Sequence, residues 1–280
     1  MEEKLLQMKS LVERLNQASD SYYNGKGELM TDYEWDALFD QLKRLEEETG
    51  EILPDSPTNR VSEDSIVGKK EEHEFAALSL AKTKQVSDLV KWAEDRPIWI
   101  SWKLDGLTLV VTYDGGKLTK IVTRGNGHIG TNITHLAPAI SGIPGTISEK
   151  GHLVVRGEAV ISYTDFEQFI IESEGDYANP RNLASGSLTL KDIEEVKQRH
   201  IQWIPFTLVY TERELTSWGE RMQMLKDLGM NPVERERIDH PTTENIQLEI
   251  DKFTEKVTSK KNPFPVDGLV ICYDDTAYAA

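Results

Sequence analysis

The feature that most constrains the fold is an apolar run that ends near a lysine and is followed by an alternating pattern. Residues 98–106 read Ile-Trp-Ile-Ser-Trp-Lys-Leu-Asp-Gly. Apolar residues then alternate over 107–113. Asp114-Gly115-Gly116 is typical of a turn, and residues 118–123 would form a second strand that runs back along the first. Alternation on both sides of such a turn predicts a β-hairpin. Lys103 is therefore expected at a strand end, where a rigid sheet can aim a reactive group.

Lys103 is the candidate nucleophile. A lysine amine reacts only after losing a proton, from an unperturbed pKa of about 10.4, so an active lysine needs apolar surroundings and a nearby cation. Trp99 and Trp102 flank it and could supply the apolar surface. The simpler interpretation is a surface lysine beside a hairpin, because Lys-x-Asp-Gly alone is a weak signal.

Composition excludes several classes of protein. The chain has 280 residues, enough for one large domain or a small domain beside a larger one, and its net charge is −16. Such an acidic balance argues against this chain gripping a phosphate backbone by itself. The single cysteine, Cys272, rules out an internal disulfide and a tetrahedral zinc set built from cysteines. With neither a leader nor an apolar run long enough for a bilayer, we expect a soluble, cytoplasmic protein.

The first fifty residues predict two helices. Apolar residues recur at helical spacing over 5–15, and a second apolar stripe covers 35–45. Thr31 and Glu34 have the spacing of a capping box at the start of the second helix. We expect the residues between the helices, 21–27, to form an aromatic loop, and the polar stretch 62–72 to be a linker after a turn.

The rest of the chain predicts an α+β domain with a largely antiparallel sheet. Further strands are expected at 153–160, 203–210 and 268–273. Helices are expected at 86–94, 163–172, 191–198, 217–228 and 243–256.

A glycine-rich segment, 125–130, matches the dinucleotide-binding pattern G-x-G-x-x-G. Its context is wrong for that motif, which requires a crossover helix. The preceding strand is a hairpin arm, and Pro138, Gly142 and Pro144 interrupt the segment where the helix would run. We therefore expect a bend, with Arg124 beside it placed to meet a phosphate.

Several short motifs, in shared order and spacing, resemble the N-terminal adenylation region of the bacterial NAD-dependent DNA ligases, of which the chain would be a divergent member. The segments that carry the resemblance are Tyr22-Tyr23, Pro54-Asp55-Ser56-Pro57-Thr58, His73 with Leu78-Ser79-Leu80, Lys103-Leu104-Asp105-Gly106, Thr123-Arg124-Gly125, Val155-Arg156-Gly157-Glu158, Ala178-Asn179-Pro180-Arg181-Asn182 and Val266-Asp267-Gly268. It implies a helical subdomain at 1–62 that binds the nicotinamide mononucleotide (NMN) half of NAD. An ATP-grasp-like nucleotidyltransferase domain with mainly antiparallel sheets would follow at 63–280, ending before the family's last lysine motif.

The resemblance also implies a reaction. The family's lysine, here Lys103, attacks the α-phosphate of NAD, releases NMN and keeps AMP as lysyl-AMP, the first step of nick sealing in DNA repair and replication. The implied catalytic positions are Lys103, Asp105, Arg124, Glu158 and Asp267, with Glu158 near the AMP ribose. Mg²⁺ is expected to be held mainly by phosphate and water, so no metal ligands are assigned.

Further residues match positions that bind the nucleotide in this family. These implied cofactor-binding residues are Tyr22, Tyr23, Asp32, Trp35, Asp36, Leu78, Ser79, Leu80, Trp102, Leu104, Gly106, Arg181 and Phe206. Phe206 would place its ring against adenine. Simpler roles exist, since Asp32 and Asp36 open a helix, where carboxylates are favoured anyway, and an aromatic residue such as Phe206 is by default core.

Departures from the family pattern keep alternatives open. Cys272 stands where the family has a lysine and Thr189 where it has an arginine, so two cations near phosphate are lost. Ser101 stands where the family has a glutamate, Asn126 where it has an aspartate and Thr131 where it has a glutamate. Trp35 in place of a tyrosine is a mild change. One alternative is an ATP- or GTP-using lysine nucleotidyltransferase, such as an RNA ligase or a capping enzyme. Another is an NAD-binding or AMP-binding module with weakened catalysis.

The expected partner is nicked double-stranded DNA, contacted by the full-length protein and only weakly or not at all by this acidic chain. No membrane partner is expected, and the chain is expected to be a monomer.

Overall fold

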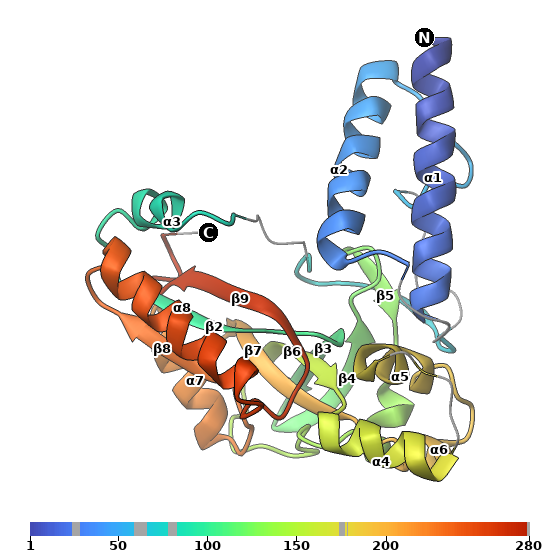
Figure 1. The fold of residues 1–280 in the computed structure, drawn as a ribbon. Helices are drawn as coiled ribbons and strands as arrows, with labels where there is room; N and C mark the ends of the chain where they lie inside the picture. Colours follow the sequence, from blue (N-terminus) through green and yellow to red (C-terminus); the bar gives the residue numbers. More distant parts are fainter. Residues whose placement is uncertain (24–28, 59–65, 78–82, 174–176, 178, 279–280) are drawn as a thin grey trace.

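The computed structural model describes residues 1–23, 29–58, 66–77, 83–173, 177 and 179–278. The helices are α1 (Glu2–Tyr23), α2 (Asp32–Thr49), α3 (Val86–Ala93), α4 (Tyr163–Ser173), α5 (Pro180–Ser187), α6 (Ile193–Lys197), α7 (Trp218–Asp227) and α8 (Thr243–Thr258), with a 3-10 helix η1 (Thr134–Ala139). The strands are β1 (Lys70–Glu72), β2 (Ile98–Leu104), β3 (Leu107–Asp114), β4 (Lys117–Thr123), β5 (Ile129–Thr131), β6 (Leu153–Val160), β7 (Gln202–Thr211), β8 (Arg235–Ile238) and β9 (Val266–Tyr273). The predicted α+β architecture is confirmed (Figure 1).

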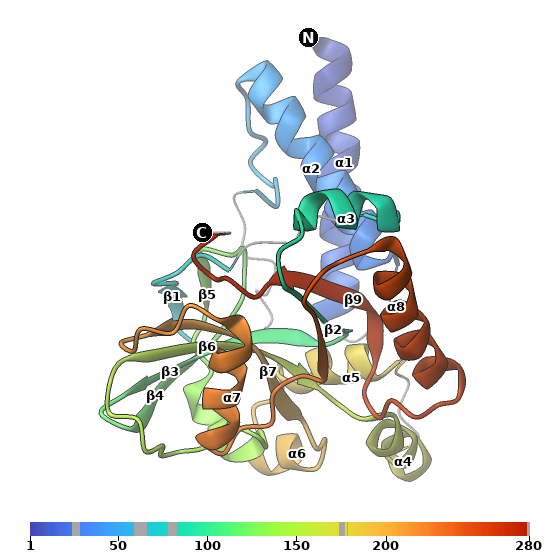
Figure 2. The same cartoon turned by 90° about the vertical axis from the view of Figure 1, so that its left-hand side faces the viewer.

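Helices α1 and α2 form an antiparallel pair that projects away from the sheets (Figures 1 and 2). The pair has a small core of its own, in which Met8, Leu15 and Leu42 are fully buried. The capping box is confirmed, because the Thr31 hydroxyl accepts from the Glu34 amide and the Glu34 carboxylate accepts from the Thr31 amide. Helix α1 extends to Tyr23, so the sequence interpretation of 21–23 as loop is wrong.

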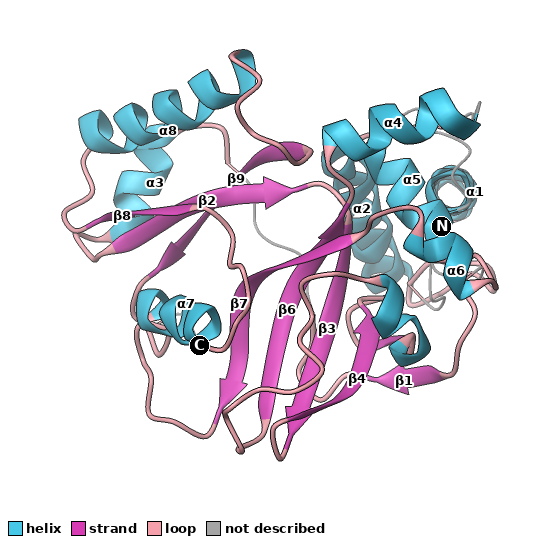
Figure 3. Ribbon diagram, turned by 90° about the horizontal axis from the view of Figure 1, so that it is seen from below, coloured by secondary structure: helices cyan, strands magenta, loops and turns pink. Residues whose placement is uncertain are grey.

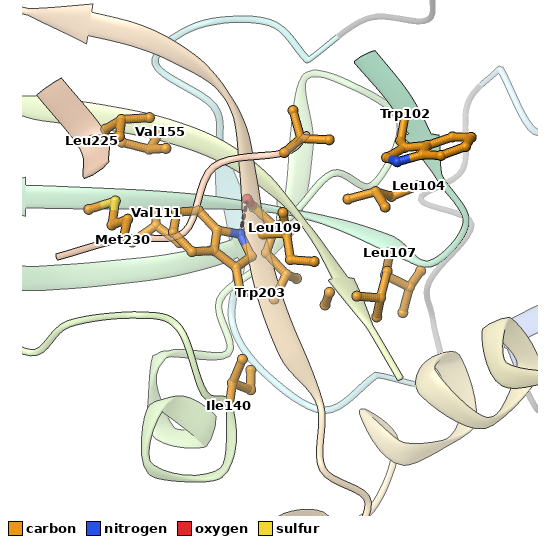
Figure 4. Close-up of a cluster of buried hydrophobic side chains, with 14 of the residues drawn as sticks. Trp102, Leu104, Leu107, Leu109, Val111, Ile140, Val155, Trp203, Leu225 and Met230 are labelled. Carbon is orange, nitrogen blue, oxygen red and sulfur yellow. Dashed lines mark hydrogen bonds between the residues drawn. The ribbon is translucent and has the colours of Figure 1, made fainter. Parts of the chain in front are cut away.

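The predicted hairpin forms one edge of a four-stranded antiparallel sheet in the order β4-β3-β6-β7. Asp114 pairs with Lys117 across the Gly115-Gly116 turn, as the alternation indicated. The main apolar core contacts this sheet (Figure 4). There the buried indole of Trp203 on β7 donates to the Leu109 carbonyl of β3 at 3.2 Å.

Strand β2 lies in the middle of a second antiparallel sheet, in the order β8-β2-β9. Ile98 and Ile100 are fully buried on the same face of β2. Figure 3 shows α3 and α8 beside this sheet and α7 beside β7. The chain therefore crosses from one sheet to the other at Asp105-Gly106, between β2 and β3.

Gly106 is required by this crossing. A Cβ atom at this position would lie 2.0 Å from the carbonyl oxygen of Ala159 on β6. Only a residue without a side chain allows the two backbones to approach so closely. Gly106 thus joins strands of two different sheets.

Several local features differ from the sequence predictions. Strand β1 pairs with β5, with Glu71 opposite Gly130, inside the stretch expected to be a linker. Residues 125–128 of the glycine-rich segment form a bend, as predicted, and its last two residues begin β5, after which comes the 3-10 helix η1. Helix α5 and strand β8 were not predicted. Among the described residues, no helix is both long and apolar enough to cross a bilayer.

Candidate functional site

Lys103 lies near the end of β2 and pairs with an aspartate of the neighbouring strand β9. Its Nζ atom is 2.9 Å from Oδ2 and 3.0 Å from Oδ1 of Asp267. The Lys103 side chain retains 30% of its exposure, so the amine remains accessible. The predicted strand-end lysine is therefore held from the side by a carboxylate of the same sheet.

Two more carboxylates approach the same point from other parts of the chain. Asp32, the first residue of α2, has its Oδ2 atom 3.8 Å from Lys103 Nζ. Asp105 lies in the crossing after β2, where its amide donates to the Pro265 carbonyl. Asp32, Asp105 and Asp267 each offer a carboxylate oxygen, and these atoms lie within 4.8 Å of one another.

Arg181 of α5 is the second cation in this cluster. Its Nη2 donates to Oδ1 of Asp32, and its Nε lies 3.3 Å from Oδ1 of Asp105. The helix that carries it is capped by Asn179, whose side chain accepts from the Asn182 amide, and Pro180 is its first residue. All eight residues of α5 are buried, which fixes the arginine in place.

The surrounding carboxylates control the protonation of Lys103. Burial lowers the pKa of the Lys103 amine, but Asp267, Asp32 and Glu158 together raise this pKa above its ordinary value. In this state the amine holds its proton. A nucleophilic role therefore requires that bound substrate or a cation weakens these ion pairs.

Glu158 of β6 lies half-buried beside this cluster. Its Oε1 accepts from the Thr108 hydroxyl at 2.8 Å, and its Oε2 accepts from the Gly106 amide at 3.2 Å. Burial raises the pKa of Glu158 to about 7, although both hydrogen bonds and the Lys103 charge favour its ionised form. A carboxyl group whose pKa is shifted toward neutrality by burial and by a specific charged neighbour is a common feature of functional sites.

Arg124 lies beside the segment that follows β1. Its Nε donates to the Ala77 carbonyl at 2.9 Å, and its own carbonyl lies 2.9 Å from Nε2 of His73. Arg156 of β6 reaches the same segment and donates to the Ala76 carbonyl at 2.6 Å. The structure thus brings Arg124 next to residues 76–77, while Arg181 stands among the carboxylates around Lys103.

The two tryptophans of β2 do not form the apolar surroundings expected for Lys103. Trp102 lies on the opposite face of the strand, because successive side chains of a strand alternate. Its Nε1 donates to Glu234 at 3.0 Å and its ring packs edge-on against Phe253. Trp99 donates to Asp274 at 2.7 Å, at the other end of the strand. The amine is instead surrounded by charge.

Other predicted cofactor-binding residues are placed as follows. Leu104 is buried in the main core. Trp35 donates to the Leu15 carbonyl and stacks on Phe39 within the helical pair. Phe206 is half-buried at a bulge of β7, between the partners of Arg156 and Gly157. Asp36 is half-buried on α2. Leu78, Ser79, Leu80 and the side chains of Tyr22 and Tyr23 lie outside the described residues.

The positions that lost a family cation carry no replacement charge of their own. Cys272 lies on β9 opposite Trp99, and burial raises the pKa of its thiol to about 12, so the thiol stays neutral. The Thr189 hydroxyl donates to the Gly186 carbonyl at the end of α5.

Thr108, which donates to Glu158, is a residue of this site that the sequence analysis did not identify. A threonine in a predicted strand gives no sequence signal that it contacts a functional carboxylate.

Family models match both parts of the chain. Residues 69–280 match the "NAD-dependent DNA ligase adenylation domain" and residues 1–62 the "DNA ligase-like, N-terminal NAD+-binding domain". Proteins named DNA ligase from Lachnoclostridium phytofermentans and Ruminiclostridium cellulolyticum are each 39% identical to it over 99% of its length. The chain covers 43% and 42% of these relatives, so it spans less than half of their length.

A solved structure described as a putative ATP-dependent DNA ligase from Aquifex aeolicus is more distantly similar. The alignment has a TM-score of 0.45 and 15% sequence identity, and it covers 73% of this chain and 49% of that one.

Proposed function

Because the chain belongs to the NAD-dependent DNA ligase family, whose NAD-binding and adenylation regions it spans, we propose that Lys103 is the nucleophile that takes AMP from NAD. The observation that carries this proposal is the position of the Lys103 amine, at a strand end among three carboxylates and an arginine. These groups can orient an amine and a phosphate toward each other.

In the proposed step the Lys103 nitrogen forms a bond to the α-phosphorus of NAD. The phosphorus–oxygen bond to NMN breaks, NMN leaves with the bonding electrons, and the protonated amine gives up two of its three protons, so that one N–H remains. Asp267, which holds both hydrogen bonds to the amine, aims the nitrogen and is the nearest carboxylate for one of these protons. AMP then remains on Lys103 as a phosphoramidate.

Arg181 is the proposed phosphate-binding group. Its guanidinium now contacts Asp32 and Asp105, and its fork of N–H donors suits phosphate oxygens equally well. Charge that builds on the α-phosphate during attack would be stabilised by this cation. Glu158 is proposed to accept a hydrogen bond from an AMP ribose hydroxyl, and Phe206 to lie against adenine.

Residues 1–62 are proposed to form the subdomain that binds the NMN half of NAD, and residues 63–280 the adenylation domain. The contacts of Asp32 with Arg181 and Lys103 support these two roles, because they place the start of α2 beside the proposed nucleophile. Tyr22, Tyr23, Trp35 and Asp36 are the other proposed contacts of the helical pair.

Mg²⁺ is the proposed metal. Carboxylate oxygens suit this hard cation, and Asp32, Asp105 and Asp267 converge. Lys103 and Arg181 already neutralise much of that charge, which supports a cation held mainly by phosphate and water. When bound, the cation would withdraw charge from phosphate oxygens and weaken the pairing of Lys103 with its carboxylates.

Nick sealing is proposed for a longer protein that contains this chain, with nicked double-stranded DNA as its substrate in DNA repair and replication. The net charge of −16 supports little or no DNA binding by the chain alone. A cytoplasmic, monomeric protein is proposed. Neutral Cys272 and Thr189 favour one rival, a module that binds NAD without transferring AMP.

The test is the release of NMN. The chain is incubated with NAD and Mg²⁺, or with ATP and Mg²⁺, and released NMN or pyrophosphate is quantified by chromatography. We expect one equivalent of NMN and no pyrophosphate. Pyrophosphate release would favour an ATP-dependent nucleotidyltransferase, whereas calorimetric binding of NAD without NMN release would favour the binding module.

A further inference from the structure

We infer that Thr108 is a positioning residue for this proposed adenylation: its hydroxyl holds the Glu158 carboxylate in the orientation and ionised form that accept a hydrogen bond from the nucleotide. The inference rests on the proposed function and adds to it a residue that acts through Glu158. Thr108 lies two residues beyond the Lys-x-Asp-Gly segment and belongs to none of the short segments that carry the family resemblance.

The geometry around Glu158 carries the inference. Thr108 on β3 lies directly opposite Glu158 on β6 in the antiparallel ladder. The Thr108 hydroxyl donates to Oε1 at 2.8 Å, and the Gly106 amide donates to Oε2 at 3.2 Å. Each carboxylate oxygen is thus held by one donor. Rotation of the carboxylate would break both bonds where the side chain is partly shielded from water, and a lost hydrogen bond there is costly.

The two donors are not equivalent. The Gly106 amide is fixed by the backbone crossing, because the neighbouring Ala159 carbonyl leaves no room for a side chain at residue 106. The Thr108 hydroxyl is a side-chain donor, so a single substitution can remove it. The same residue also accepts the Arg124 amide through its carbonyl oxygen at 3.1 Å, a contact that side-chain substitution leaves in place.

The charge state of Glu158 depends on this donor. Burial raises its pKa, Asp105 raises it further, and Lys103 lowers it, as do the bonds from Thr108 and Gly106. With the pKa at about 7, loss of one donor would leave Glu158 largely protonated at neutral pH. A protonated carboxyl carries a donor of its own and accepts from a ribose hydroxyl less well.

Substitutions of Thr108 separate this role from simple packing. Thr108→Val keeps the shape of the side chain and removes the hydroxyl, and Thr108→Ser restores the donor. Thr112→Val is the matched control, because Thr112 is buried on the same face of β3. If Thr108→Val fails to fold, as judged by its thermal unfolding, Thr108→Ala carries the same test.

The first readout is the rate of AMP transfer from NAD between about pH 6 and about pH 9. We expect Thr108→Val to move the acidic limb of the profile upward by about one pH unit, the size of one hydrogen bond to a charged group. The rate at neutral pH should fall about fivefold and recover at high pH, while Thr108→Ser and Thr112→Val follow the wild type. A uniform loss at every pH, or an unchanged profile, would overturn the inference.

The second readout does not require catalysis. The side-chain carboxyl of Glu158 is titrated by ¹³C NMR in the substrate-free chain, with Glu158→Gln to assign its signal. Thr108→Val should raise the midpoint of this titration relative to the wild type. An identical midpoint in both proteins contradicts the inference even if AMP transfer occurs. A raised midpoint in a chain that never gains AMP leaves the Thr108–Glu158 relationship intact and refutes the proposed function instead.

Discussion

The carboxylate of Asp32 lies 3.8 Å from the amine of Lys103, although the two residues belong to the helical pair and to the central strand of a sheet. The same carboxylate accepts a hydrogen bond from Arg181. One side chain at the start of α2 therefore contacts both cations of the candidate site. Substrate that draws Asp32 away from Lys103 would at the same time remove a charge that keeps the amine protonated.

Asp32→Asn should make Lys103 more reactive in the absence of substrate. Removing one of the charges that raise the pKa of Lys103 frees a larger fraction of neutral amine at a given pH. We expect labelling of Lys103 by an amine reagent to accelerate about two- to fivefold, the factor that corresponds to a partly exposed ion pair. The rate is measured by mass spectrometry of the peptide that contains Lys103.

Two comparisons sharpen this test. Asp267→Asn should accelerate the labelling more than Asp32→Asn does, because Asp267 makes both short contacts to the amine. Asp40→Asn, an exposed position on the same helix, should leave the labelling unchanged. Equal labelling of Asp32→Asn and wild type would show that the helical pair does not influence Lys103.

Gly106→Ala should damage both stability and AMP transfer. The added methyl group would meet the Ala159 carbonyl oxygen at 2.0 Å, so the crossing between the sheets must move and take the Gly106 amide away from Glu158. We expect a loss of about 1 to 3 kcal/mol in the free energy of unfolding, measured by urea denaturation. AMP transfer should slow about tenfold or more for the loss of one oriented donor.

Gly145→Ala is the control for that substitution. Nothing lies within 4 Å of the Cβ position of residue 145. Its stability should match or slightly exceed that of the wild type, because alanine restricts the unfolded chain. If Gly106→Ala behaves like Gly145→Ala, the close approach of the two backbones is unimportant.

Much of the fold follows from local sequence patterns. The 107–123 hairpin was predictable because its strands alternate around an Asp-Gly-Gly turn, and α2 because Thr31 and Glu34 form a capping box. Helix α5 was not predictable, since its sequence Pro-Arg-Asn-Leu-Ala-Ser-Gly-Ser favours turns and its stability comes from complete burial. Strands β1 and β8 are short and polar, and only pairing with distant partners makes them strands.

The candidate site was predictable only in part. A lysine at a strand end followed from the pattern around Lys103. The convergence of Asp32, Asp105, Asp267 and Arg181 did not, because four separate segments supply them and periodicity carries no information on such contacts. The resemblance named these positions without their geometry. The sequence predicted an apolar surface of tryptophans around Lys103, and only the structure shows that charged side chains surround it.

His152→Gln should cost more stability in acid than in base. His152 bridges two elements, with Nδ1 2.6 Å from Asp114 and Nε2 2.8 Å from Glu74. The hydrogen bond to Asp114, followed by the contacts with Glu74, raises the pKa of His152 in the folded state. Its stabilising contribution is therefore full below the unfolded pKa of about 6.5 and is lost as the pH rises through the folded pKa.

Urea denaturation at about pH 5.5 and about pH 9 measures this difference. The gap in unfolding free energy between wild type and His152→Gln should shrink at the higher pH. His135→Gln, at an exposed histidine, serves as the control and should show a smaller change. A gap that is the same at both pH values would mean that the bridge carries no pH-dependent stability.

The most direct test of the account locates AMP on the chain. Wild type, Lys103→Ala and Lys91→Ala, a control at an exposed lysine of α3, are incubated with NAD and Mg²⁺. Intact mass and peptide mapping are then recorded. We predict one added AMP in wild type and Lys91→Ala, on the peptide that contains Lys103, and none in Lys103→Ala. An adduct that persists in Lys103→Ala, or a folded wild type that gains no AMP from NAD, would contradict the assignment of Lys103 as the nucleophile.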